Sequence, residues 1–168
     1  MRILGLLFAM IVLFSSGCIA ERKAMFNEDE FRAYAQKGNA VIFGDAFLKT
    51  RGGEIRKAAG NTIYLTPATA YTAEWIAHVT KYAARRMTPA DPRYFQYERT
   101  TTADGDGRFE FTDLPPGHYF VATKIVWDAP TRGGLTETGG WVYAQVEVAK
   151  GDKKKIVVTH TQVEDRLM

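Results

Sequence analysis

The sequence predicts a mainly β protein, an antiparallel β-sandwich of about seven strands. Three observations indicate this fold. Short runs rich in β-branched and aromatic residues follow one another from Ala40 onward, and glycine-containing turns separate them. A third is that helical periodicity is confined to two short segments. Successive strands without helices between them favour antiparallel pairing, since parallel strands need long crossover connections.

The chain opens with a segment typical of a signal peptide, residues 1–17. Arg2 precedes an apolar run from Ile3 to Phe14, which is shorter than the roughly 20 residues of a transmembrane helix. Small residues then lead to Cys18, the only cysteine of the 168 residues. Cleavage before Cys18 would leave 151 residues, enough for one domain, and the loss of Arg2 would lower the formal net charge from +3 to +2.

Residues 15–18, Ser-Ser-Gly-Cys, resemble the lipobox of bacterial lipoproteins, in which the cysteine is lipidated and becomes the new N-terminus. Ser15 departs from the aliphatic residue that is usual there. The resemblance implies that Cys18 carries acyl chains such as palmitate, which anchor the protein firmly when two or three are present. Ile19 stands where the inner-membrane retention signal has an aspartate, so the expected location is the bacterial outer membrane, facing the periplasm. The alternative is that Cys18 ends an uncleaved signal or membrane anchor.

Residues 18–38 are expected to form the lipidated tether together with a short helix. Asn27 is a suitable N-cap, because three acidic residues follow it at the positive end of the helix dipole. Phe31 and Tyr34 would share one side of this helix, which is predicted to end near Gly38. It would either lie against the domain or space the domain from the bilayer.

The β-sandwich domain is expected to span residues 39–161, followed by a C-terminal tail at 162–168. In its penultimate strand, Val142 and Ala144 alternate with Trp141 and Tyr143, so one strand face is predicted to be buried and the other solvated. A short edge strand is added at 54–57. The seven predicted strands are residues 41–49, 62–66, 94–102, 108–112, 118–127, 141–149 and 154–160.

One segment inside the domain, residues 72–86, has a helical period instead. Its apolar stripe includes Trp75 and Ile76, whereas His78 falls outside the stripe. Thr72 is the predicted N-cap. We expect a helical insertion that packs over the sandwich between two strands, with its aromatic stripe serving as core; the alternative is that the stripe lines a ligand groove.

Two turn motifs bracket a very short strand in the middle of the domain. Residues 104–111 read Asp-Gly-Asp-Gly-Arg-Phe-Glu-Phe, and residues 114–121 read Leu-Pro-Pro-Gly-His-Tyr-Phe-Val. Asp106 and Gly107 predict a hairpin turn, since glycine adopts positive φ without strain. Together the motifs resemble the signature of the carboxypeptidase regulatory-like family. That resemblance implies a transthyretin-like (prealbumin-like) β-sandwich but no particular activity, because the matching positions are turns and core residues.

The sequence offers no convincing metal, cofactor or catalytic set. Asp104 and Asp106 resemble the start of a calcium loop, but the twelfth position counted from Asp104, where a bidentate acid is needed, is proline. The three histidines, His78, His118 and His160, have no spacing that would hold zinc. No serine follows Cys18, which excludes a Ser-His-Asp hydrolase in the mature chain.

The remaining functional candidates are aromatic residues on the solvated side of the sandwich. Trp141 and Tyr143 share a strand face and Trp127 is expected to begin the preceding loop, so these rings could form a platform for a sugar or another partner. The mild net charge does not indicate nucleic-acid binding. The leading hypothesis is a non-enzymatic, lipid-anchored interaction or structural module of the bacterial cell envelope, whose partner is an envelope protein or a glycan. The alternative is a carbohydrate- or ligand-binding module that uses the three aromatic residues.

Overall fold

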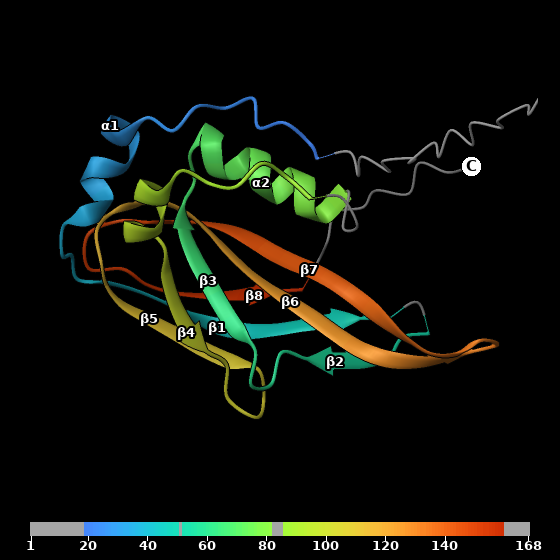
Figure 1. Cartoon of the computed structure of the whole chain (residues 1–168). Helices are drawn as coiled ribbons and strands as arrows, with labels where there is room; N and C mark the ends of the chain where they lie inside the picture. The colour runs from blue at the N-terminus through green and yellow to red at the C-terminus, as the bar shows by residue number, and fades with distance from the viewer. Residues whose placement is uncertain (1–18, 51, 82–85, 160–168) are drawn as a thin grey trace, which may run out of the picture.

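The computed structural model describes residues 19–50, 52–81 and 86–159, which form two four-stranded sheets packed face to face (Figure 1). The predicted mainly β sandwich is confirmed. The predicted signal peptide at 1–17, Cys18 and the tail at 162–168 lie outside the described residues. The strands are β1 (Ala40–Lys49), β2 (Ile55–Lys57), β3 (Thr62–Pro67), β4 (Arg99–Thr102), β5 (Arg108–Leu114), β6 (Gly117–Thr131), β7 (Gly134–Val148) and β8 (Lys153–Val158). The helices are α1 (Glu28–Phe31) and α2 (Ala70–Lys81), with 3-10 turns η1 (Arg32–Ala35) and η2 (Pro92–Gln96).

In the first sheet, β1 pairs with β5 along one edge and with β8 and then β2 along the other. The second sheet has the order β4-β3-β6-β7. Every pair is antiparallel except β1 with β8, which run parallel. The parallel pair is possible because β8 follows β1 only after the chain has built the rest of both sheets, which supplies the long crossover that parallel pairing needs.

The core lies between the two sheets and consists of the inward residues of each strand. Ile42, Ile63, Leu114, Val121 and Val142 are fully buried there. Burial of one such side chain contributes about 1.5–3 kcal/mol relative to exposure. Because side chains alternate along a strand, every second residue faces the core and its neighbours form the outer face.

The Asp-Gly turn between β4 and β5 forms as predicted. The Asp104 carboxylate accepts hydrogen bonds from the backbone N–H groups of Asp106 and Arg108, both at 2.8 Å. Gly107 has φ +80°, and a Cβ at that position would lie 2.6 Å from the Ala46 carbonyl oxygen. Asp104 therefore organises a turn rather than a cation loop.

Several predicted elements differ from the observed ones. The strands predicted at 118–127 and 141–149 extend to Gly117–Thr131 and Gly134–Val148, so the loop expected between them is part of a long hairpin. Residues 94–96 belong to the helical turn η2 and not to a strand, and Tyr97 is its C-cap. The Asp91 carboxylate accepts from the Arg93 N–H and caps the start of this turn, so β4 starts only at Arg99. The predicted helix at 72–86 begins at Ala70, so Thr69 and not Thr72 precedes its first turn. The Thr69 hydroxyl accepts from the Thr72 N–H at 3.3 Å.

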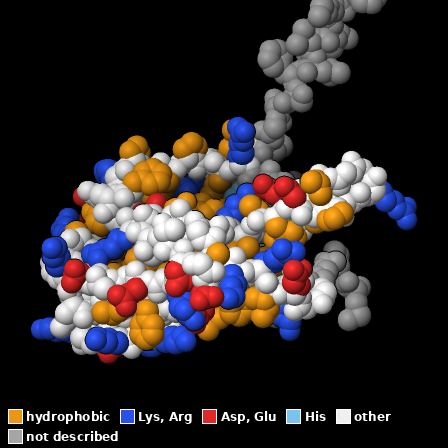
Figure 2. Space-filling model, turned by 90° about the horizontal axis from the view of Figure 1, so that it is seen from below, with side chains coloured by type: hydrophobic (Ala, Val, Ile, Leu, Met, Phe, Trp, Pro, Cys, Tyr) orange, Lys and Arg blue, Asp and Glu red, His pale blue; other side chains and the backbone are white. Residues whose placement is uncertain are grey.

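The two outer faces of the sandwich differ. The outer face of the β4-β3-β6-β7 sheet, called the covered face below, carries α2 (Figure 1). Ile76 of this helix packs against Phe120 and Ala122. The outer face of the other sheet is called the open face. Viewed from below, the molecule shows charged side chains of both signs interspersed with apolar ones (Figure 2).

Residues 19–27, called the strap below, run along α2 before the chain enters α1 (Figure 1). Ala20 forms a β-bridge with Met87. The Ala20 N–H donates to the Arg86 carbonyl at 2.8 Å, and the Ala20 carbonyl accepts from the Thr88 N–H at 2.9 Å. The predicted tether therefore lies against the domain in its described part.

Candidate functional site

A pocket of about 410 Å³ lies between the covered face, α2 and η2. Its wall is mainly apolar and rich in aromatic rings, and its polar groups are few, which is the usual composition of a small-molecule site. The aromatic residues that line it are Tyr64, Tyr71, Trp75, Tyr94, Phe95 and Trp141. The charged or titratable residues that line it are Arg22, His78 and Glu98.

Trp141 is central among the aromatic residues of this pocket. Its ring centroid lies 4.9 Å from that of Trp75 in an edge-to-face arrangement and 5.7 Å from that of Tyr64. The sheet register explains this placement, because Tyr64 and Trp141 are outward residues of β3 and β7, and Trp75 reaches them from α2. Three rings from three elements thus meet at one end of the pocket.

The other end of the pocket is formed by a second aromatic group. Tyr71 from α2 and Tyr94 from η2 have ring centroids 5.7 Å apart, and Phe95 lies 5.4 Å from Tyr94. Phe31 of α1, which is fully buried, packs edge-to-face on both Tyr71 and Tyr94. This group holds η2 against α2 and so fixes the width of the pocket.

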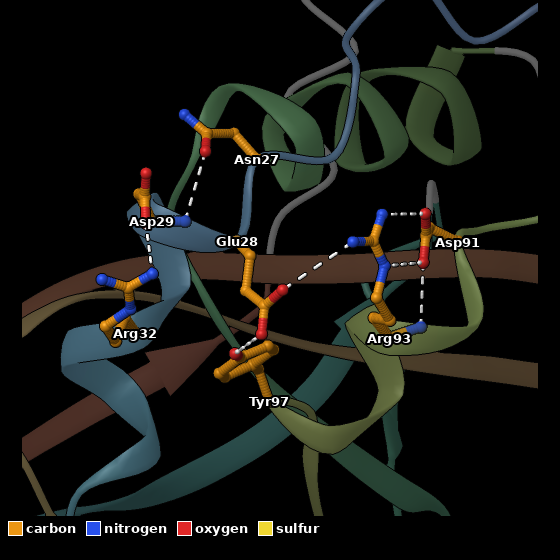
Figure 3. Close-up of polar contacts among 7 residues, drawn as sticks. All are labelled: Asn27, Glu28, Asp29, Arg32, Asp91, Arg93 and Tyr97. Atoms are coloured by element: carbon orange, nitrogen blue, oxygen red, sulfur yellow. Dashed lines mark hydrogen bonds and ion pairs between the residues drawn. The ribbon is translucent and has the colours of Figure 1, made fainter.

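Ion pairs and hydrogen bonds between α1 and η2 reinforce this packing (Figure 3). The Glu28 carboxylate lies 3.7 Å from the Arg93 guanidinium and 3.5 Å from the Tyr97 hydroxyl. Arg93 also donates two hydrogen bonds to Asp91, and the Arg93 side chain holds the pKa of Asp91 down at about 2. These contacts are exposed, so they orient the two elements more than they stabilise them.

Glu98 is the carboxylate of the pocket. It is half-buried, and burial raises its pKa, while the Tyr94 hydroxyl, which donates to it at 3.2 Å, lowers the pKa in part. Burial also raises the pKa of Tyr94, chiefly by desolvation, so its hydroxyl keeps its proton. Among the described residues, Glu98 forms no ion pair. A half-buried carboxylate without a cation has unused capacity to accept hydrogen bonds from a ligand.

The strap contributes Arg22 to the pocket wall. The Glu74 carboxylate of α2 accepts the backbone N–H groups of Lys23 and Ala24 at 2.8 and 2.7 Å, which fixes the strap beside the helix. The guanidinium carbon of Arg22 then lies 4.2 Å from the centre of the Tyr71 ring, and its Nη1 donates to the Tyr71 carbonyl.

The structure separates the three aromatic residues singled out from the sequence. Trp141 lines the pocket. Tyr143 lies on the same face beside Phe120, with ring centroids 6.2 Å apart, but does not line the pocket. Trp127 does not begin a loop: it lies within β6, where the register places it on the opposite side of the sheet, near the guanidinium of Arg56 at 5.4 Å. The three rings therefore do not form one platform.

Of the three histidines, His78 was expected outside the apolar stripe of its helix, yet it is buried and lines the pocket. His118 is exposed beside Glu147, and His160 lies outside the described residues. Cys18, the predicted lipidation site, also lies outside them. Of the predicted ligand residues only Trp141 lines the pocket, and the residues missed include several brought in from a distance, among them Arg22, Tyr64, Tyr94 and Glu98.

None of the helices in the described part of the chain has the length and apolar character needed to cross a bilayer. No group of three or more His, Cys, Asp or Glu residues within residues 19–50, 52–81 and 86–159 is placed to hold a metal ion.

The fold and the pocket define a β-sandwich protein with an aromatic, ligand-sized site on its covered face. This chain belongs to the same family as PA1324, a protein of Pseudomonas aeruginosa. The crystal structure of that protein is described as one of a "putative carbohydrate binding protein". The two share 33% sequence identity, with a TM-score of 0.74, over 80% of this chain and 97% of the other. No family model matches the chain, and no curated protein does.

Proposed function

We propose that this protein binds carbohydrate, and that the pocket on the covered face is the binding site. The observation that carries the proposal is the pocket itself: Trp141, Trp75 and Tyr64 offer ring faces and edges at one end, and Glu98 offers a hydrogen-bond acceptor. Sugars combine apolar C–H faces with hydroxyl groups, so rings beside a carboxylate suit them. The description of the Pseudomonas aeruginosa relative supports the same reading.

Binding fits this pocket better than glycoside hydrolysis. Most glycosidases need two carboxyl groups across the scissile bond, one as acid and one as base or nucleophile. Among the described residues that line the pocket, Glu98 is the single carboxylate. The protein is therefore proposed to act without catalysis, and incubation of oligosaccharides with it should release no reducing ends.

The experiment is a glycan array followed by titration calorimetry with the purified full chain and its Trp141→Ala variant. We expect saturable binding by the wild type and a loss of at least about tenfold in affinity for the variant, since a central aromatic contact carries about 1.4 kcal/mol or more. Trp127→Ala is the matched control, because it removes the same ring from the other side of the sheet. Absence of saccharide binding, or equal losses in the two variants, would contradict the proposal.

We further propose that Cys18 is lipidated and holds the domain at the bacterial envelope, at the outer membrane facing the periplasm. The support is the sequence of residues 15–18 and the lone cysteine after an apolar run. The resemblance to the carboxypeptidase regulatory-like family likewise stays a prediction from the turn motifs. Metabolic labelling with a palmitate analogue should mark the wild type and not Cys18→Ala; labelling of both would overturn the anchor.

A further inference from the structure

Arg22 places a positive charge in the pocket wall from outside the sandwich. Its guanidinium is stacked on Tyr71, and Nη1 donates to the Tyr71 carbonyl at 3.1 Å. The backbone bonds from Lys23 and Ala24 to Glu74 fix the strap on the C-terminal side of this residue. The side chain is therefore held in one orientation before any ligand arrives.

The charge of Arg22 is only partly compensated within the described part of the chain. The Glu74 carboxylate attracts it: burial raises the pKa of Glu74, and the Lys23 and Ala24 N–H groups and then Arg22 lower it below its usual value, but the two side chains form no ion pair. The ion pairs there include none to Arg22, and its Nε is buried without a hydrogen-bond acceptor. The Glu74 carboxylate binds backbone N–H groups, and Glu98 accepts from Tyr94. A half-buried guanidinium that stacks on a ring and forms no ion pair can bind an anionic ligand at the pocket wall.

We propose that the saccharide bound in this pocket is acidic, and that Arg22 binds its carboxylate. This inference rests on the proposed function and names the class of sugar. A planar guanidinium matches a carboxylate in geometry and forms charge-assisted hydrogen bonds with it. In this arrangement the rings of Trp141 and Trp75 contact the sugar, and Glu98 accepts from its hydroxyl groups. The formal net charge is positive, +3 for the full sequence and +2 once Arg2 is removed with the proposed signal peptide, which mildly favours approach of an anionic ligand.

The test compares an oligogalacturonate with its methyl ester, which keeps every hydroxyl group and loses the charge. Binding of both is measured by calorimetry with the wild-type full chain, Arg22→Gln, Arg22→Lys and Lys23→Gln. Lys23→Gln is the matched control, because it removes the same charge from the next residue, which does not line the pocket. Thermal unfolding of each variant checks that the fold is retained.

We expect the wild type to bind the acid at least about tenfold more tightly than the ester, which is about 1.4 kcal/mol. Arg22→Gln should remove that preference, Arg22→Lys should retain part of it, and Lys23→Gln should leave it unchanged. If acid and ester bind equally and both depend on Trp141, the protein binds carbohydrate but the acidic ligand is wrong. If Arg22→Gln and Lys23→Gln lose the preference for the acid over the ester equally, the preference is a general charge effect, and the proposed role of Arg22 is wrong. If neither probe nor any other saccharide binds, the proposed function itself fails.

Discussion

The outer face of the β4-β3-β6-β7 sheet carries aromatic side chains, whereas the outer face of the other sheet carries charged side chains arranged in ion pairs. On the open side, Lys155 and Asp45 lie 3.1 Å apart, and Asp106 pairs with Lys57 at 2.7 Å and with Arg108 at 3.0 Å. Both faces arise from the same alternation along strands. The type of the outward residues therefore decides whether a sheet face is exposed to water or is covered by further elements. On the covered face these elements are α2 and η2, and the pocket lies between them and the sheet.

The largest expected difference between the faces concerns stability. Phe31→Ala removes a fully buried ring that packs on Tyr71 and Tyr94, and it should lower the free energy of unfolding by about 3–5 kcal/mol. Phe47→Ala on the half-buried outer side of β1 should cost less than half as much, because its ring already meets water. Urea unfolding of both variants measures the difference. Equal losses would show that the aromatic layer on the covered face is not a second core.

An intermediate effect is expected from the start of α2. Thr69→Ala removes the hydroxyl that accepts the Thr72 N–H and should lower the free energy of unfolding by about 1 kcal/mol. Because α2 forms the pocket wall, saccharide affinity should fall as well. Thr102→Ala, at an exposed position of the edge strand β4, should change stability by less than about 0.5 kcal/mol. Thermal unfolding and calorimetry test both, and a larger effect of Thr102→Ala would contradict the cap.

The smallest expected effects concern how the stability of the fold depends on pH, and they have opposite signs on the two faces. Burial raises the pKa of Glu98 in the folded protein. Its favourable contribution to stability is therefore fully present below the pKa of the unfolded chain, and it is lost as the pH rises through the pKa of the folded protein. Lys57 and then Arg108 lower the pKa of Asp106, so its contribution is present above its unfolded pKa and is lost as the pH falls through its folded pKa.

Two variants turn these opposite shifts into a measurement. Glu98→Gln should raise the unfolding temperature at pH 7 relative to the wild type while weakening saccharide binding. Asp106→Asn should lower the unfolding temperature slightly at pH 7 and have no effect near pH 2. Calorimetric melting curves from pH 2 to pH 8 give both results. A Glu98→Gln variant that is less stable at pH 7 would show that this carboxylate is structural and not kept for a ligand.

The fold could be predicted from the sequence because its signals are local. The Asp104 turn, the alternation in β7 and the Asn27 cap each depend on a few neighbouring residues. The helical turn η2 was missed because its aromatic residues have high strand propensity. The capping Asp91 before proline was the signal that could have identified it.

The pocket could not be predicted in the same way, because it is assembled from five separate parts of the chain. Trp141 was found through its position on a solvated strand face, but only the strand register shows that Tyr64 lies beside it and that Trp127 does not. Nothing near Arg22 in the sequence indicates that it reaches a pocket formed by α2 and η2. The position of its backbone depends on Glu74, about 50 residues away along the chain.

The bridge between Ala20 and Met87 limits how far the domain could stand from a membrane. Ala20 is hydrogen-bonded to the folded body, and only two residue steps separate it from Cys18. Two steps of extended chain reach at most about 7 Å. If Cys18 carries the lipid, the linker between the anchor and the folded domain is very short. The domain would then rest on the bilayer surface with the strap side nearest the lipid. It would then meet only those saccharides that are themselves delivered to, or attached at, that surface.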